Sequence, residues 1–124
     1  MALLPLPKML EKTQRIFNAW VRRRDIEGSF FKCISCGKVL DASKMQAGHF
    51  VPQKNSSYLR YNEDNVNGEC QGCNGFDTFH LVGYRKNLAE KIGEKRIQYL
   101  EANQRTIKKW TRSELEFLID KYKL

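Results

Sequence analysis

The first regular hydrophobic pattern lies between residues 8 and 24. Apolar side chains recur there three and four positions apart, with lysine and arginine between them, which predicts an amphipathic helix. These apolar residues are Met9, Leu10, Ile16, Phe17, Trp20 and Val21. The polar segment 25–28, which closes on a glycine, is expected to end the helix.

The middle of the chain is patterned for short extended segments. Apolar pairs flank a Cys-x-x-Cys motif in 29–40, which predicts a short hairpin around a turn that bears two cysteines. Residues 45–51 form a second extended stretch, which Pro52 stops. The polar segment 52–64 is expected to be a loop.

The remainder is patterned mainly for helices. Apolar spacing predicts a helix over 79–92 that stops at Gly93, followed by a second helix over 94–103. The last predicted helix starts with the capping-box pattern Thr111-Arg-Ser-Glu114. Short strands and separate helices make the expected fold class α+β. We expect a single domain, 1–124, made of an N-terminal helix (8–27), a core (28–92) and a C-terminal helical extension (93–124).

Composition narrows the class of protein. The chain has 124 residues, of which 41% are hydrophobic, so a folded domain is expected and not a disordered chain. No apolar run approaches the roughly 20 residues that a membrane-spanning helix needs. The apolar opening is broken by prolines and lacks the basic start of a signal peptide. We therefore expect a cytoplasmic protein without a membrane partner.

The charge indicates a class of partner. The formal net charge is +8, and residues 1–62 carry 11 basic and 4 acidic side chains, against 11 and 10 in residues 63–124. A basic excess suits a polyanion, above all nucleic acid, because each neutralised phosphate releases condensed counterions. A well-solvated basic protein without such a partner has the same composition, so the charge alone leaves both interpretations open.

Four cysteines form two Cys-x-x-Cys pairs, Cys33 with Cys36 and Cys70 with Cys73. Thiols stay reduced in the cytosol, which makes two disulfides the weaker interpretation, and a redox motif needs only one pair. Four thiolates are the tetrahedral ligand set of a structural Zn²⁺. Gly37, directly after the first pair, permits the positive φ of a zinc-knuckle turn. One structural zinc is predicted, with disulfides and free thiols as the open alternatives.

The order of motifs around His49 resembles a nuclease family. A strand that ends in histidine, then an asparagine, then Cys-x-x-Cys-Asn is similar to the HNH (ββα-metal) nucleases, and two cysteine pairs are typical of the recombination endonuclease VII group within them. A closer resemblance, over roughly residues 10–100, is to the lambda-type NinG (Rap) phage recombination nucleases. The motifs that carry it are Arg24-Asp25, Cys33-x-x-Cys36-Gly37-Lys38-Val39-Leu40, Gly48-His49-Phe50, Glu63-Asp64-Asn65 and Cys70-x-x-Cys73-Asn74.

The resemblance implies a metal-dependent DNA endonuclease that acts on branched recombination intermediates such as Holliday junctions and D-loops. His49 would be the general base, because a neutral imidazole with a pKa near ~6.5 can take a proton near neutral pH. A catalytic Mg²⁺ or Mn²⁺, with Asn74 as a ligand, would act as a Lewis acid on the scissile phosphate. Asn65 would hold the loop that positions His49. The residue preferences at helix starts, taken alone, would instead make Asn74 an N-cap.

One position departs from the family pattern. Many of these nucleases carry an aspartate before the base histidine as a second metal ligand, whereas this chain has Gly48. His80 and Asp77 are the candidate substitutes. Asp77 lies three residues after Asn74 and hence on the same face of a helix, whereas His80 can join the site only if 75–78 is irregular. His80 has an equally plausible interpretation in helix packing.

DNA contacts are predicted for basic residues near these motifs: Arg22, Arg23, Arg24, Lys54 and Arg60. The arginines at the helix end would also be favourable to the helix dipole without any DNA. Phosphate contacts of this kind position a duplex and do not read its sequence.

Two functions from different classes stay open. One is the structure-selective endonuclease; the other is a zinc-stabilised DNA-binding or adaptor protein whose nuclease site has decayed, which Gly48 favours. A homodimer would suit symmetric cleavage of two strands. Trp20, Trp110 and Phe117 on the end helices could form its interface or pack on the chain's own core.

Overall fold

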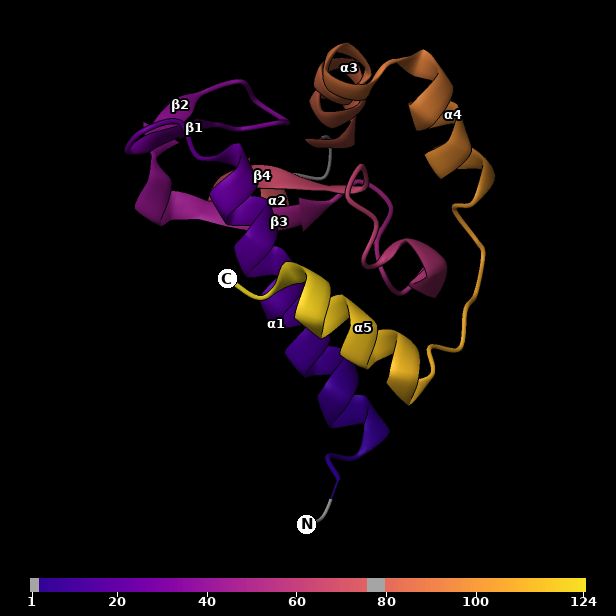
Figure 1. The fold of residues 1–124 in the computed structure, drawn as a ribbon. Helices are drawn as coiled ribbons and strands as arrows, with labels where there is room; N and C mark the ends of the chain where they lie inside the picture. Colours follow the sequence, from indigo (N-terminus) through magenta and orange to yellow (C-terminus); the bar gives the residue numbers. More distant parts are fainter. Residues whose placement is uncertain (1–2, 76–79) are drawn as a thin grey trace.

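The computed structural model describes residues 3–75 and 80–124, and they form the predicted mixed α+β fold (Figure 1). The helices and strands are α1 (Leu6–Asp25), β1 (Phe30–Lys32), β2 (Val39–Asp41), β3 (Met45–His49), β4 (Val66–Cys70), α2 (Gln71–Gly75), α3 (His80–Ile92), α4 (Glu94–Ala102) and α5 (Arg112–Tyr122), with 3₁₀ turns η1 (Ala42–Lys44) and η2 (Ser57–Leu59). None of the helices in the described part of the chain is long and apolar enough to cross a membrane.

Helices α1 and α5 lie side by side although they come from opposite ends of the chain (Figure 1). Phe17 of α1 meets Tyr122 of α5 edge-on, with ring centroids 4.8 Å apart. Helix α5 begins with the predicted capping box: Thr111 Oγ1 accepts from the backbone N–H of Glu114, and the Glu114 side chain accepts from the Thr111 N–H. Helices α1 and α5 therefore form one hydrophobic core together.

The aromatic residues of the two end helices divide between core and surface. Trp20 and Trp110 pack against the core that α1 and α5 share, which favours the packing interpretation for both. Phe117 is 66% exposed. Of the three residues considered for a dimer interface, Phe117 is thus the one that faces solvent.

Two antiparallel hairpins follow α1. In the first, Phe31 of β1 pairs with Leu40 of β2, and Gly37 has a φ of 76° in the turn between them, so the predicted hairpin and its glycine are confirmed. In the second, β3 pairs with β4, and Gly48 lies opposite Asn67. The apolar pattern did not predict β4, because small and polar residues dominate this segment and leave no alternation to recognise.

The β3–β4 hairpin lies between α1 and α3 and presents two different faces, since side chains alternate along a strand. Ala47 and Val66 pack into the apolar core shared with α1. Asn67 and Glu69, from the opposite face, bond to side chains of α3. Both are essentially inaccessible to solvent, so one face of this hairpin is a buried polar layer.

The predicted polar loop 52–64 is only partly a polar surface. It lacks strands and contains the short turn η2, but Leu59 is fully buried and Tyr61 is 5% exposed. These two side chains join different hydrophobic cores, one with α3 and α4 and the other with α1 and α5. The loop is therefore a structural link between the cores.

Helices α3 and α4 have nearly the predicted bounds, and Gly93, with a φ of 88°, separates them. Leu88 of α3 and Ile97 of α4 are fully buried in a shared core. The predicted C-terminal extension is thus divided: α4 packs with α3, whereas α5 packs with α1.

Candidate metal and active site

The four cysteines, which we call the cysteine cluster, converge on one point. Cys33 and Cys36 follow β1, Cys70 ends β4, and Cys73 lies in α2. Their Sγ atoms all lie within 4.8 Å of one another, and the Cys36 and Cys70 Sγ atoms are 3.9 Å apart. A tetrahedral Zn²⁺ with Zn–S bonds of ~2.3 Å separates its sulfurs by about 3.8 Å. The cysteines are therefore positioned to bind one metal ion.

The surroundings of the cysteine cluster suit thiolates. The backbone N–H groups of Cys36 and Cys70 donate to Cys33 Sγ at 3.5 and 3.3 Å. Burial raises the pKa of the Cys33 and Cys73 thiols, so a bound cation is needed to keep these two thiols ionised at neutral pH. Four sulfur ligands would occupy all four positions of a tetrahedral zinc ion, so the arrangement is consistent with the predicted structural zinc.

His49 ends β3 and is held by the main chain of the following loop. Its Nε2 lies 3.1 Å from the carbonyl oxygen of Arg60; an N–H that donates there leaves the lone pair on Nδ1. Burial lowers the pKa of His49 below its usual 6.5, opposed by the hydrogen bond to the carbonyl and aided by the Arg60 guanidinium charge. The ring is therefore neutral at neutral pH, as a general base must be.

Asn65 has the geometry expected of a residue that holds this loop. It is fully buried, and its Oδ1 accepts from the Val51 N–H at 2.8 Å. Its Nδ2 donates to the carbonyls of Val51 and Leu59 at 3.0 and 3.1 Å. One side chain thus ties together the residues just after His49 and those just before the Arg60 carbonyl.

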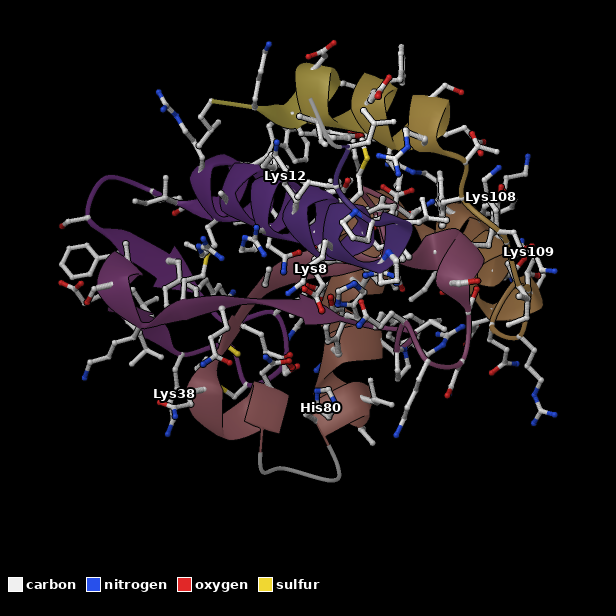
Figure 2. All side chains as sticks on the ribbon, turned by 90° about the horizontal axis from the view of Figure 1, so that it is seen from below. Lys8, Lys12, Lys38, His80, Lys108 and Lys109 are labelled. Carbon is white, nitrogen blue, oxygen red and sulfur yellow. The ribbon has the colours of Figure 1, made fainter. Side chains whose placement is uncertain are left out.

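An open hollow of about 350 Å³ brings together the predicted base and the two predicted metal ligands of the described residues, His49, Asn74 and His80. We call it the His49 hollow; its lining residues are His49, Pro52, Gln53, Lys54, Asn74 and His80. They come from the end of β3, the following loop, α2 and α3. Figure 2 shows His80 at the start of α3. Residues up to 31 positions apart in sequence thus meet around one cavity.

Asn74 lies near the end of α2 and does not open a helix, so the N-cap interpretation is wrong. Its Nδ2 donates to Gln46 Oε1 at 2.8 Å. This hydrogen bond orients the amide and directs the other end, Oδ1, toward Gly48. An amide oxygen is a suitable ligand for a hard divalent cation.

The condition set for His80, an irregular segment over 75–78, lies mostly outside the described residues; helix α2 is described as far as Gly75 and helix α3 from His80. His80 Nδ1 lies 2.6 Å from Glu69 Oε2, and that carboxylate fixes the ring with Nε2 as the nitrogen available to an ion. The packing interpretation also retains support, because the ring meets Tyr84 edge-on at 6.3 Å. Asp77, the other candidate ligand, lies outside the described residues.

The five basic residues predicted to contact DNA have different environments. Arg22 and Arg23 are exposed at the end of α1, and Lys54 is exposed at the His49 hollow. Arg60 is partly buried, with Nε donating to Gln14 Oε1 at 3.0 Å. Figure 2 shows further lysines, Lys8 and Lys12, along α1, both exposed.

Arg24 differs from its neighbours. Its guanidinium donates to the Asp25 carboxylate, to the carbonyls of Glu63 and Val66, and to Asn67 Oδ1, over 2.7–3.2 Å. These contacts join the end of α1 to β4 and the loop before it. These partners hold the Arg24 guanidinium within the fold, and a DNA contact by Arg24 stays a prediction.

Two residues beside the His49 hollow were not identified as site residues from the sequence. Tyr84 is fully buried, and its hydroxyl donates to the Gly48 carbonyl at 2.6 Å, next to the predicted base. Glu69 is the buried partner of His80. Neither has a spacing that marks it: Tyr84 fits a helix core pattern, and Glu69 precedes a cysteine in a strand that the pattern does not reveal.

Comparison of the sequence with known proteins places the chain in a family. A model of the family described as the bacteriophage lambda NinG protein matches residues 1–124. The chain is 32% identical to protein ninG of Escherichia phage lambda over 122 residues, 98% of this chain and 57% of that protein. It is also 32% identical to protein ninG of Escherichia phage 933W and 31% identical to that of Salmonella phage P22, each time over 98% of this chain and 58% of the relative.

The chain therefore spans little more than half the length of the curated relatives that it matches. No solved structure matches it significantly. A family match over the whole chain, together with these relatives, shows that it belongs to the NinG family.

Proposed function

We propose that this chain is a divalent-metal-dependent DNA endonuclease of the HNH type that cuts branched recombination intermediates. The observation that carries the proposal is the His49 hollow, where a neutral histidine, an amide oxygen and a second histidine meet beside a lysine. The proposal is supported by the order of elements β3, β4 and α2, in which two paired strands precede a helix, as in a ββα arrangement. The resemblance of the motifs to recombination nucleases supports the class of substrate.

In this proposal, His49 activates the attacking water. Its Nδ1 takes a proton while Nε2 donates to the Arg60 carbonyl, which keeps the ring oriented throughout. The oxygen of the water bonds to phosphorus, and the bond from phosphorus to the 3′ oxygen breaks. Asn65 fixes the loop behind the ring, so its contribution is positional.

Asn74 and His80 would hold one Mg²⁺ or Mn²⁺. Bound there, the ion supplies Lewis-acid stabilisation of charge on the phosphate and the leaving oxygen. Lys54, exposed at the rim, would neutralise a neighbouring phosphate, with Arg22, Arg23 and Arg60 as further contacts. The zinc of the cysteine cluster would remain structural.

The test is cleavage of a labelled four-way junction by the zinc-loaded protein with and without Mg²⁺ or Mn²⁺. His49→Ala should reduce the single-turnover rate by about 10²–10⁴-fold, the usual contribution of a general base. Asn55→Ala, an exposed change in the following loop, is the matched control and should cut at the wild-type rate. Equal cleavage by His49→Ala and wild type would rule out this mechanism.

A zinc-stabilised DNA-binding or adaptor protein is the second candidate, and Gly48 is the observation that favours it. That function predicts junction binding with no divalent-dependent cleavage by the wild-type protein. Linear, looped and four-way substrates of the same sequence, compared side by side, measure the proposed preference for branched DNA. Light scattering of the protein with and without a junction tests the proposed homodimer.

A further inference from the structure

Glu69 is a fully buried carboxylate with only one of its two oxygens in use. Oε2 accepts from Ser35 Oγ and lies 2.6 Å from His80 Nδ1. Oε1 is also buried, and it has no hydrogen-bond partner among the described residues. A buried carboxylate oxygen without a partner is costly, which calls for a further ligand at this atom.

The direction of Oε1 indicates where that ligand would lie. A methyl group placed on Gly48 would overlap Glu69 Oε1 and would lie 3.0 Å from Asn74 Oδ1. Both oxygens therefore face the same small volume beside the Gly48 Cα. Glycine at position 48 is what leaves this volume to Glu69, because any larger residue there would displace the carboxylate.

We propose that Glu69 Oε1 is a ligand of the divalent ion held by Asn74 and His80. This inference rests on the proposed nuclease function and deepens it. The Glu69 carboxylate reaches the site from β4, the strand paired with the one that carries Gly48. In the family pattern, by contrast, an aspartate lies on the same strand as the base histidine. A carboxylate and an amide oxygen together form the oxygen-rich set that Mg²⁺ and Mn²⁺ prefer.

The Glu69 carboxylate would then be one ligand of the ion and would also orient a second ligand, His80. Oε1 binds the ion directly, and Oε2 orients the His80 ring so that Nε2 can bind it. Ser35, in the turn that carries the first cysteine pair, fixes the carboxylate by its hydroxyl. A role for Glu69 limited to orienting His80 would use Oε2 and leave Oε1 unexplained.

The experiment measures Mn²⁺ affinity by electron paramagnetic resonance, using the zinc-loaded chain of residues 1–124 without DNA. Glu69→Gln keeps an oxygen that can accept from Ser35 and His80 but replaces the other oxygen by an NH₂ group. We expect it to weaken Mn²⁺ binding by at least about tenfold. Glu90→Gln, an exposed carboxylate on α3, is the control and should bind like wild type. One zinc per chain in every variant verifies the fold.

A transplant variant separates a ligand from an orienting residue. Glu69→Ala should lose Mn²⁺ binding, and adding Gly48→Asp to it should restore the affinity to within about fivefold of wild type, because the new carboxylate enters the volume that Glu69 vacated. The remaining Cβ at position 69 would lie 3.0 Å from the new one and must shift slightly. An aspartate at position 48 does not replace the contact of Glu69 Oε2 with His80. Restored Mn²⁺ affinity would therefore show that the lost function of Glu69 was direct binding of the ion.

The outcomes distinguish the two proposals. If wild type binds Mn²⁺ and His49→Ala abolishes cleavage, but Glu69→Gln binds Mn²⁺ as tightly as wild type, Glu69 is not a ligand and the nuclease proposal stands. If the transplant variant remains as weak as Glu69→Ala, the ligand role is likewise overturned. If wild type neither binds Mn²⁺ nor cuts DNA, both proposals fail.

Discussion

The molecule contains two groups of potential metal ligands, and they differ in composition and in access. The cysteine cluster offers four identical soft ligands whose sulfurs lie within 4.8 Å of one another. The His49 hollow offers an amide oxygen and imidazole nitrogens around an open space of about 350 Å³. Structural metal sites are filled by protein ligands, whereas catalytic sites keep positions for water and substrate. The cysteine cluster is consistent with the first design, and the hollow would have the second if it holds the proposed ion.

The two sites are also joined through neighbouring residues. Glu69 is adjacent to Cys70 on β4, and Asn74 is adjacent to Cys73 in α2. Alternation along the strand turns the Cys70 side chain toward the cysteine cluster and that of Glu69 toward the hollow. An ion in the cysteine cluster would therefore fix the backbone from which Asn74 and Glu69 project.

Removal of the metal from the cysteine cluster is the change with the largest expected effect. Structural zinc contributes an apparent ~10–16 kcal/mol in small zinc domains, which is as large as the whole stability of a typical domain. We expect that chelation, or Cys73→Ser, abolishes the cooperative thermal transition seen by circular dichroism. A metal-free chain with an unchanged melting temperature would contradict a structural role, and zinc content by mass spectrometry is the control.

The second prediction concerns the loop behind His49. Asn65→Ala removes an amide that bonds three buried main-chain groups. The Val51 N–H and carbonyl are then left without a partner, whereas the Leu59 carbonyl still accepts from the Asn62 N–H at 3.1 Å. At about 1–3 kcal/mol for an unsatisfied buried group, we expect a loss of about 3 kcal/mol in the free energy of unfolding, measured in urea. Unlike zinc removal, this change should leave one zinc per chain.

Asn62→Ala serves as a comparison for Asn65→Ala, because Asn62 is in the same loop and its Oδ1 accepts from the backbone N–H groups of Asp64 and Asn65. Its partners are only partly buried, so its loss should cost less. Equal losses from the two variants would show that burial of the Asn65 amide has no special importance.

The sequence made the cysteine cluster easier to predict than the hollow, for a physical reason. Two Cys-x-x-Cys pairs are local motifs whose chemistry is nearly independent of the rest of the fold. Glu69 can be identified as a site residue only when the pairing of β4 with β3 is known. Strand β4 itself has too little apolar alternation to be recognised in the sequence. Helices α1, α3, α4 and α5 were predicted within a few residues because their apolar spacing and the Thr111 cap are also local signals, whereas the short helix α2 was not predicted.

The third prediction uses the pKa of His49, which burial holds below 6.5. Above pH 6.5 the ring is neutral and the single-turnover rate should be independent of His49 ionisation. As the pH falls through the lowered pKa, the ring gains a proton and the rate should fall. Arg60→Gln removes the cation that helps to lower this pKa but keeps the main-chain carbonyl, so the midpoint of the profile should move upward. If this variant leaves the midpoint unchanged, the pH dependence of the rate does not report the ionisation of His49.

The smallest effects are expected at the surface, where the neighbours Arg23 and Arg24 have different environments. Arg23 is exposed, so Arg23→Gln should leave the melting temperature unchanged and lower the slope of log K against log salt for junction binding by about 1. Arg24→Gln removes hydrogen bonds to Val66 and Asn67 and should instead lower the melting temperature, with little change in the salt slope. The salt slope and the melting temperature of each variant measure the two roles separately. If Arg24→Gln changes the salt slope as much as Arg23→Gln does, the guanidinium leaves its internal partners to meet DNA, and its assignment to the fold alone is wrong.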